Sequence, residues 1–343
     1  MGKIGLIVLA SLASLNLRIG AWAASKPEIA RWYGNRKAAV SLRFDDSLSS
    51  HVEYVIPTLN KYGIKATFMI NPGTRRYRKH RKFWETQVPR MGHDLGDHTM
   101  HHSGADSVEE ADYEIGEVSR LIWRLYPNRS KLMVFASGGG AKWGGENWEK
   151  LPPESGYKKL VEKYCLIDLY DGKHPAYSMH SSISANTACN AVDKTIREGG
   201  HLPFLFHAIG NPGFLDRLKA LFHGYQLVTS RSTFQGIIQC ITDREPELWA
   251  APVLDVLKYE AEHSGSRLKI ISRKKDEDRL FLSVATNPAL YDHDLTLLVP
   301  NEGKRPVRSV FQVGGRTGKF LEEGHVVLVD VQPINSEIVI RYR

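Results

Sequence analysis

Short apolar runs alternate with amphipathic segments from Lys37 to about Asp243, and this alternation constrains the fold more than any other feature of the sequence. The strand-like runs read AAVSLRF, KATFMIN, KLMVFAS and HLPFLFHAIG, and helix-like segments such as SVEEADYEIGEVSRLIWRLY and TACNAVDKTIREGG lie between them. Strands that are joined through helices pair in parallel. The sequence therefore predicts an α/β fold, as a (β/α) barrel or a doubly wound sheet.

The pattern changes after Pro252. A helix-like stretch, VLDVLKYEAEH, leads into six short strand-like runs, which read RLKIIS, RLFLSVAT, DLTLLVP, SVFQVGG, HVVLVDV and EIVIRYR. Turn residues between the runs predict a small antiparallel β-sandwich. We therefore expect an α/β domain over residues 24–245 and a β-rich accessory domain over residues 250–343. The second domain has no cluster of catalytic residue types, so its predicted role is structural.

The first 23 residues have the pattern of a cleaved secretory signal peptide. Lys3 precedes the apolar run IGLIVLASLASLNL, and Ala21-Trp22-Ala23 supplies an A-x-A cleavage site. Asn16 and Arg18 interrupt the run before it can span a bilayer, which disfavours a permanent membrane anchor. We expect a secreted or periplasmic protein. In an oxidising compartment, Cys165, Cys189 and Cys240 allow one disulfide and one thiol, although three buried free cysteines are equally compatible.

The chain is basic, with 46 Lys and Arg against 38 Asp and Glu, a net charge of +8. Part of this surplus is local, because TRRYRKHRK at residues 74–82 carries six of the basic residues. We interpret this run as a solvated loop in preference to a contact for an acidic glycan. No aromatic-basic recognition motif accompanies the charge, and the chain carries an export signal. Both observations disfavour nucleic-acid binding.

Polar residues gather where the predicted strands end. AVSLRFDDS closes on Asp45 and Asp46, GHDLGDHTMHH contains His98 and His102, and HLPFLFHAIG places His207 after an apolar strand. The two histidines are four residues apart, so a helical turn there would put both imidazoles on one face, ready for a metal. Carboxyl ends of parallel strands meet at one edge of the sheet, where α/β proteins build their sites. The three signals therefore indicate one shared site.

These stretches, in this order, resemble the polysaccharide deacetylase family, which is also the NodB-homology family or carbohydrate esterase family 4. The resemblance covers about residues 37–234. The family's T-F-D-D motif appears as RFDD at residues 43–46, and its H-[ST]-x-x-H motif is intact as HTMHH at residues 98–102. Its L-x-x-H element appears in FLFH, which ends at His207.

The resemblance implies a distorted (β/α) barrel that removes acetyl groups, N-linked or O-linked, from an acetylated carbohydrate polymer. It implies one divalent metal ion, usually zinc, held by Asp46, His98 and His102. Such a metal lowers the pKa of a bound water and polarises the acetyl carbonyl. Asp45 would then be the general base and His207 the general acid. A backbone N–H in the loop after KLMVFAS, at Gly139, would bind the oxyanion.

Two features depart from the family pattern. The family carries an arginine that holds the base in an R-P-P-Y-G-like motif, but this chain reads ASGGG at residues 136–140. The aromatic D-x-x-x-W element is also absent near residues 167–177. Residues i and i+2 of a strand share a face, so we expect Arg43 to pair with Asp45 in place of the lost arginine. If the strand register is different, Arg43 points to solvent or to a helix.

The same departures support a second hypothesis, a catalytically impaired barrel that serves as a glycan-binding module. Intact Asp45 and His207 argue against it, because binding alone needs neither. Trp143 and Trp148 follow the glycine loop and could stack on sugar rings, although packing of a long loop explains them equally well. The sequence does not choose between N-acetyl and O-acetyl substrates.

Overall fold

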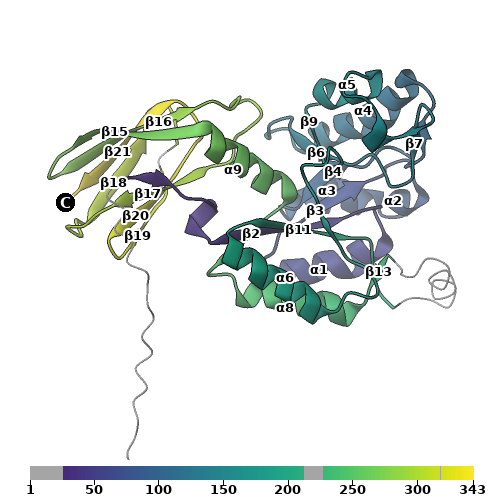
Figure 1. Ribbon diagram of the computed structural model, residues 1–343, viewed down its shortest axis with the longest axis horizontal. Helices are drawn as coiled ribbons and strands as arrows, with labels where there is room; N and C mark the ends of the chain where they lie inside the picture. Colours follow the sequence, from purple (N-terminus) through teal and green to yellow (C-terminus); the bar gives the residue numbers. More distant parts are fainter. Residues whose placement is uncertain (1–25, 212–226, 317) are drawn as a thin grey trace, which may run out of the picture.

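The computed structural model describes residues 26–211, 227–316 and 318–343, so the predicted signal peptide lies outside the described residues. An α/β unit built on a parallel sheet stands beside a β-sandwich, and helix α9 (Val253–Gly265) runs from one to the other (Figure 1). Within the described ranges, no helix is both long and apolar enough to cross a membrane.

The sheet of the α/β unit is parallel throughout. Its strands, in spatial order, are β10 (Tyr177–Ser178), β11 (His201–Phe206), β2 (Ala38–Phe44), β3 (Thr67–Ile70), β4 (Asp94–Asp97), β6 (Met133–Phe135) and β9 (Leu166–Asp168). Strand β14 (Leu248–Ala250) pairs with the first half of β2. The hydrogen-bonded path runs from β10 to β9 without closing on itself. The predicted α/β fold, a distorted barrel followed by a β-sandwich-like domain, is confirmed.

Helices follow the strands and cover one face of this sheet. They are α1 (Ile56–Lys61) after a π-helical turn at His51–Val55, α2 (Arg75–Lys79), α3 (Arg81–Arg90), α4 (Val108–Leu125), α5 (Gly156–Lys163), α6 (Ala185–Glu198) and α8 (Arg231–Asp243). Local sequence sets their ends. The Ser107 hydroxyl accepts from the Glu110 N–H at the start of α4, and Gly199 ends α6 in the left-handed conformation. The run at residues 74–82 forms α2 and the start of α3, so its prediction as a loop was wrong.

The two faces of the sheet carry different cores, because successive strand residues point to opposite sides. Phe68 and Ile70 of β3 join the large core beneath the helices. Met69, between them, packs instead with Leu254 and Leu257 of α9. Helix α9 therefore fills the other face of the parallel sheet, and it anchors there through a hydrogen bond from the Val253 N–H to the Thr67 hydroxyl (2.9 Å).

Two four-stranded antiparallel sheets form the sandwich. One is β1 (Glu28–Ile29), β17 (Leu295–Pro300), β20 (Val326–Val331) and β19 (Phe320–Glu323); the other is β15 (Ser266–Arg273), β16 (Glu277–Val284), β21 (Ser336–Tyr342) and β18 (Val307–Gln312). All six predicted strands are present. The structure adds β19 and, less expectedly, β1, because the segment just before the α/β unit pairs with β17.

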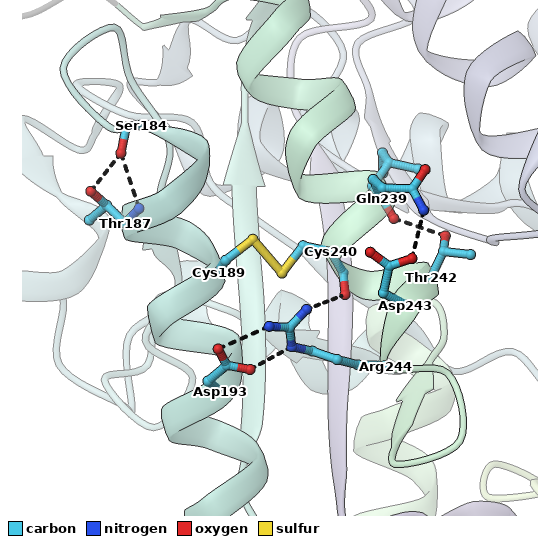
Figure 2. The surroundings of a disulfide bond; sticks show 10 residues. Ser184, Thr187, Cys189, Asp193, Gln239, Cys240, Thr242, Asp243 and Arg244 are labelled. Carbon is cyan, nitrogen blue, oxygen red and sulfur yellow. Dashed lines mark hydrogen bonds and ion pairs between the residues drawn. A yellow bond between two sulfur atoms is a disulfide. The ribbon is translucent and has the colours of Figure 1, made fainter. Parts of the chain in front are cut away.

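A disulfide joins α6 to α8 on the helix-covered face (Figure 2). It links Cys189 to Cys240, and Cys165 remains a free thiol. Beside it, Arg244 binds the carboxylate of Asp193 through Nη2 and Oδ2 at 3.0 Å, so a covalent bond and an ion pair clamp the same helix pair. Of the two cysteine states left open by the sequence, the structure has one disulfide and one thiol.

Candidate metal centre

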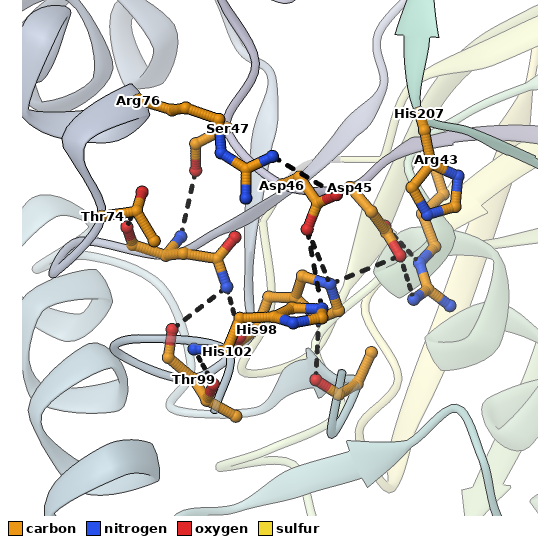
Figure 3. A network of polar contacts seen from close by, with 12 residues as sticks. Arg43, Asp45, Asp46, Ser47, Thr74, Arg76, His98, Thr99, His102 and His207 are labelled. Atoms are coloured by element: carbon orange, nitrogen blue, oxygen red, sulfur yellow. Dashed lines mark hydrogen bonds and ion pairs between the residues drawn. The ribbon is translucent and has the colours of Figure 1, made fainter. Parts of the chain in front are cut away.

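Three strand ends bring the polar residues together. Asp45 and Asp46 follow β2, His98 follows β4, and His207 follows β11. These strands run parallel, so the residues meet at one edge of the sheet, and their side chains turn toward one another (Figure 3). The Asp45 N–H donates to the Phe206 carbonyl at 3.0 Å, which ties the end of β2 to the end of β11.

His98 and His102 converge through an irregular loop rather than through the helical turn expected from their spacing. Thr99 and His102 have positive φ angles of 65° and 63°, a conformation that side-chain-bearing residues adopt only when the surroundings impose it. The two imidazole rings meet edge to face, with centroids 4.7 Å apart. The prediction that the two imidazoles lie together is confirmed, but the prediction of a helical turn between them was wrong.

Neighbouring elements hold this loop, residues 98–102, in place, and we refer to it as the histidine loop. The Asn71 amide, after β3, donates to the carbonyl of His98 and, at 3.2 Å, to that of Thr99. Glu114 of α4 accepts from the N–H of His101 and bonds its ring Nδ1 at 2.6 Å. The Asp97 carboxylate accepts from the Thr99 N–H at 3.0 Å. Both Asn71 and Glu114 are buried, so the loop is fixed from two sides.

Asp46, His98 and His102 each offer one ligand atom, and these three atoms all lie within 4.8 Å of one another. The Oδ1 atom of Asp46 is 3.7 Å from Nε2 of His98 and 3.6 Å from Nε2 of His102, too far for hydrogen bonds. It is buried and has no hydrogen-bond partner. Ligand atoms on one tetrahedral zinc ion lie about 3.4 Å apart. The donor set and its spacing therefore fit a divalent cation.

The protonation of His98 also suits a ligand. Its Nδ1 lies 2.8 Å from the Ala136 carbonyl and donates to it, which leaves the Nε2 lone pair facing Asp46. Burial lowers the pKa of His98 to about 4; the negative charge of Asp45 opposes this shift, and Arg43 adds to it. The imidazole is therefore neutral at pH 7, as a metal ligand must be.

Arg43 and Asp45 form a bidentate ion pair inside the sheet. The guanidinium Nε is 2.7 Å from Oδ1 and Nη2 is 2.6 Å from Oδ2, and the side chains are 3% and 1% exposed. The contact expected from their i, i+2 spacing is present. Burial alone would raise the pKa of Asp45, but Arg43, with smaller contributions from His98 and His207, brings it below its ordinary value. Asp45 therefore stays ionised although it is buried.

His207 lies on the opposite side of Asp45 from the histidine loop (Figure 3). Its Nδ1 is buried and has no hydrogen-bond partner. His51 of the π-helical turn binds the His207 carbonyl through Nε2 at 2.8 Å. Burial lowers the pKa of His51 to about 4, so this ring is a neutral donor that fixes the backbone of His207.

The glycine loop after β6 lies against the histidine loop. A Cβ on Gly138, whose φ is +87°, would meet three ring atoms of His102 at 3.0–3.2 Å, so only glycine fits there. Gly139 is exposed and nothing lies within 4 Å of a Cβ placed on it. Its predicted role as an oxyanion donor stays a prediction.

The two tryptophans after this loop are packing residues. Trp143 has no exposed surface, and its ring meets that of Trp148 edge to face at 5.1 Å. The indole N–H of Trp148 donates to Asp168 at 2.7 Å. The prediction that Trp143 contacts substrate is therefore corrected, because a ring with no exposed face cannot stack on a sugar.

Sequence reasoning missed several supporting residues. Arg76 of α2 places Nη1 3.8 Å from Oδ2 of Asp46, and Tyr170 lies beside Arg43 with its ring centroid 5.5 Å from the guanidinium carbon. Neither carried a sequence signal that could have found it, because each reaches the site through the fold. His51, Asn71 and Glu114 were missed for the same reason.

Comparisons with known proteins give one family match and a set of similar solved structures. Residues 33–142 match the family model of the polysaccharide deacetylases. No curated protein matches the chain. Among solved structures, a family 4 carbohydrate esterase from Streptomyces lividans in complex with acetate is 16% identical, with 63% of this chain and 92% of that chain covered and a TM-score of 0.39. Wild-type BA3943, a CE4 family pseudoenzyme from Bacillus anthracis, is 15% identical (65% and 66% covered; TM-score 0.40).

A peptidoglycan deacetylase, PdaC from Bacillus subtilis, is 17% identical over 65% of this chain and 91% of that chain, with a TM-score of 0.36. The family model spans β2, β3, β4 and the histidine loop, and so includes both aspartates and both convergent histidines. The resemblance of the chain to the polysaccharide deacetylase family is thereby confirmed over residues 33–142.

Proposed function

We propose that the protein is a secreted, metal-dependent hydrolase that removes acetyl groups from a polysaccharide or oligosaccharide. The observation that carries the proposal is the position of Asp45. This carboxylate is buried, is kept ionised by Arg43, and lies 3.7 Å from the Nε2 of a candidate metal ligand, His98. A protein that only binds glycan has no use for such a base, so this arrangement favours hydrolysis over binding alone.

Asp46, His98 and His102 would hold one divalent cation, for which zinc is the best match to the donor set. A bound zinc ion supplies a Lewis acid for the acetyl carbonyl and an acidified water. Asp45 accepts the proton of the attacking water, whose oxygen forms the new bond to the acetyl carbon. His207 donates a proton to the leaving amine or hydroxyl as the C–N or C–O bond breaks, so the products are acetate and the free sugar group.

The residues around these groups serve to position them. Arg43 holds both carboxylate oxygens of Asp45, which fixes the orientation of the base as well as its charge. His51 binds the carbonyl of His207 and Ser50 accepts from the N–H of Ile209, so the backbone from His207 to Ile209 is tied to the π-helical turn and to the residue before it. Preorganised groups of this kind need little rearrangement during reaction.

A panel of acetylated substrates tests the proposal. Acetate release should be measured from N-acetylated chito-oligosaccharides and from O-acetylated xylo-oligosaccharides, with the zinc-loaded protein and with the protein treated with chelator. We expect release from at least one class, loss of release with chelator, and recovery on adding zinc. Binding of glycan without release from either class would favour the glycan-binding module, the alternative that the absent family arginine suggests.

Export is a separate part of the proposal and rests on the N-terminal sequence alone. The predicted cleavage site after Ala23 would give a mature chain that begins at Ala24. N-terminal sequencing of the protein recovered from the medium or periplasm checks this. Recovery of an intact chain that starts at Met1 from the cytoplasm would contradict it.

A further inference from the structure

Six basic side chains stand on two consecutive helices beside the metal centre. They are Arg75, Arg76, Arg78 and Lys79 on α2, and Arg81 and Lys82 on α3. All six are exposed, whereas Tyr77 and Trp84 of the same helices are buried and stacked on each other at 6.3 Å. The aromatic pair anchors the helices and directs the cations outward. We refer to these six side chains as the basic rim.

The fold fixes the basic rim to the metal site. The Thr74 hydroxyl, which caps α2, donates to the Asn71 carbonyl at 2.9 Å, and Asn71 also holds the histidine loop. The Gly73 N–H donates to the Met100 carbonyl at 2.9 Å. A Cβ on Gly73 would lie 2.4 Å from the His101 ring, so the start of α2 fits tightly against that loop. Arg76 extends from α2 toward Asp46 (Figure 3).

Within the described residues, the cations of the basic rim outnumber the carboxylates that meet them. Lys79 is paired with Glu53 at 3.3 Å and Arg81 with Glu85 at 2.8 Å. Arg75, Arg78 and Lys82 have no ion pair within 4 Å among those residues. Arg76 reaches Asp46 at 3.8 Å, a distance for an ion pair but not for a hydrogen bond. Its side chain is 47% exposed, so its donors remain accessible.

A shallow hollow lies on the same surface. It has a volume of about 330 Å³ and is lined by Lys79, His80, Lys82, Phe83, Thr86 and Gln87. The hydroxyl of Ser49, three residues after Asp46, accepts from Lys79 Nζ at 3.3 Å and bonds His80 Nε2 at 3.0 Å. The hollow therefore adjoins the loop that carries the metal-ligating aspartate. It offers cations, hydroxyl and amide groups, and one apolar ring, a mixture that suits a charged sugar.

We propose that the basic rim binds acidic substituents of the substrate, so that the deacetylated polymer is an anionic polysaccharide. This inference rests on the proposed deacetylase function. Arg76 would meet the acidic group of the sugar that carries the acetyl group, and the hollow on α2 and α3 would hold a neighbouring unit. Guanidinium groups bind carboxylate and sulfate oxygens in pairs, which gives orientation as well as attraction. The group recognised is an anionic substituent, either a carboxylate or a sulfate, and the test below distinguishes the two.

The test uses substrate pairs that differ only in charge. One pair is O-acetylated oligogalacturonate and its methyl ester, in which release of acetate is distinguished from release of methanol. The other is an N-acetylated chito-oligosaccharide and its C6-carboxylated derivative. A sulfated, acetylated chito-oligosaccharide adds the second source of anionic groups. For the wild type, we expect a lower KM for the anionic member of a pair and loss of this preference at high salt, because salt screens exposed charges.

Matched variants locate the effect. Arg75→Gln/Arg78→Gln/Lys82→Gln removes three exposed cations of the basic rim. Lys269→Gln/Lys274→Gln/Lys275→Gln removes three exposed lysines of the sandwich and changes net charge equally. Three lost surface contacts of this kind amount to about a 10-fold change in affinity. We expect KM for anionic substrates to rise about 10-fold in the first variant, with kcat and the KM of neutral substrates unchanged, and no change in the second variant.

Arg76 separates recognition from mere support of the metal ligand. If Arg76 binds the substrate, Arg76→Gln raises KM for the anionic member only and leaves zinc content intact. If it only orients Asp46, the variant changes zinc affinity, and activity falls equally on both members of a pair. The second result would overturn the role given to Arg76.

A binding measurement keeps this inference separate from the proposed function. Calorimetry with oligogalacturonate, without turnover, should show binding by the wild type and about 10-fold weaker binding by the Arg75→Gln/Arg78→Gln/Lys82→Gln variant. Binding of oligogalacturonate without release of acetate from any substrate would refute the proposed deacetylase function but would still support the binding of anionic groups by the basic rim. Equal binding by both triple variants, no preference for the anionic member of any pair, or tighter binding of double-stranded DNA than of oligogalacturonate would overturn the inference.

Discussion

Each unit of the molecule buries an aspartate that is paired with an arginine, and the two pairs differ in their surroundings. In the sandwich, Oδ2 of the fully buried Asp278 accepts from Arg305 at 2.9 Å and from the Tyr342 hydroxyl at 2.8 Å. In the parallel sheet, Asp45 is held by Arg43 through both oxygens. Both carboxylates are shielded from water and both meet a guanidinium. Only the second lies at a sheet edge where other donors converge.

The difference lies in what surrounds each pair. Asp278 also has an unpartnered Oδ1, so an orphaned carboxylate oxygen alone does not identify a metal site. Among the described residues, only Asp46, His98 and His102 bring three metal-binding atoms close together. Parallel strands create that convergence because their carboxyl ends share an edge, whereas antiparallel strands of the sandwich alternate their ends. The two ion pairs therefore differ in the strand topology around them, because only the parallel sheet brings three metal-binding atoms next to the pair.

The largest contrast between the two units should appear when their aspartates are changed. Asp46→Asn removes the charged metal ligand, so we expect zinc content to fall from about one ion per chain to near zero, with activity lost. Asp278→Asn should leave zinc content unchanged and lower only the stability of the sandwich. Metal analysis of both purified variants checks this. Retention of zinc by Asp46→Asn would show that the ligand assignment is wrong.

His207→Ala tests the acid without touching the ligand set. We expect kcat to fall roughly 10²–10⁴-fold, the range for loss of a general acid, with zinc content unchanged. Steady-state kinetics and metal analysis on the same sample give both readings. If zinc is lost as well, His207 is a ligand or a structural residue and not the proton donor.

Removing the arginine of each arginine–aspartate pair should show which pair affects catalysis and which affects only stability. Arg43→Met leaves a buried carboxylate without its partner, which costs about 3–5 kcal/mol and lowers turnover. Arg305→Met should cost less, about 1–3 kcal/mol, because Arg305 is partly exposed and Tyr342 still donates to Asp278. Urea unfolding and kinetics with saturating zinc check both variants. Equal loss of turnover in the two variants would break the comparison.

The smallest contrast concerns pH. Burial lowers the pKa of His93, in the α/β unit, to about 4, and raises that of Glu262, on α9, to about 8. Between pH 6.5 and 4, His93 is protonated in the unfolded chain but not in the folded chain. The free energy of unfolding therefore decreases as the pH falls through this range. Between pH 4.5 and 8, Glu262 is protonated in the folded chain but not in the unfolded chain. The free energy of unfolding therefore decreases as the pH rises through this range.

Substitution should remove these two dependences one at a time. We expect His93→Gln to flatten the acid side of the stability profile by up to about 3 kcal/mol, and Glu262→Gln to flatten the alkaline side by up to about 5 kcal/mol. Urea unfolding across the pH range measures this. An unaltered acid side in His93→Gln would mean that other buried imidazoles dominate there.

The sequence predicts most of the sheet edge but not the loops that complete the site. Asp45, Asp46, His98 and His207 could be placed because each follows an apolar strand, and parallel strand ends must meet. The position of His102 depends on left-handed turns at Thr99 and at His102 itself, which spacing does not reveal. Arg76 was hidden because α2 is short and highly charged, a composition typical of loops. The pairing of β1 with the sandwich joins segments more than 260 residues apart, beyond the reach of local patterns.

The central claim is that this metal centre removes acetyl groups, and acetate release against zinc content tests it most directly. The measurement titrates zinc into chelator-stripped protein and follows acetate released from the substrate that responds in the panel. We predict that release rises in proportion to bound zinc and saturates at about one ion per chain, because one ligand set is present among the described residues. Full zinc occupancy with no acetate released from any substrate would contradict the claim.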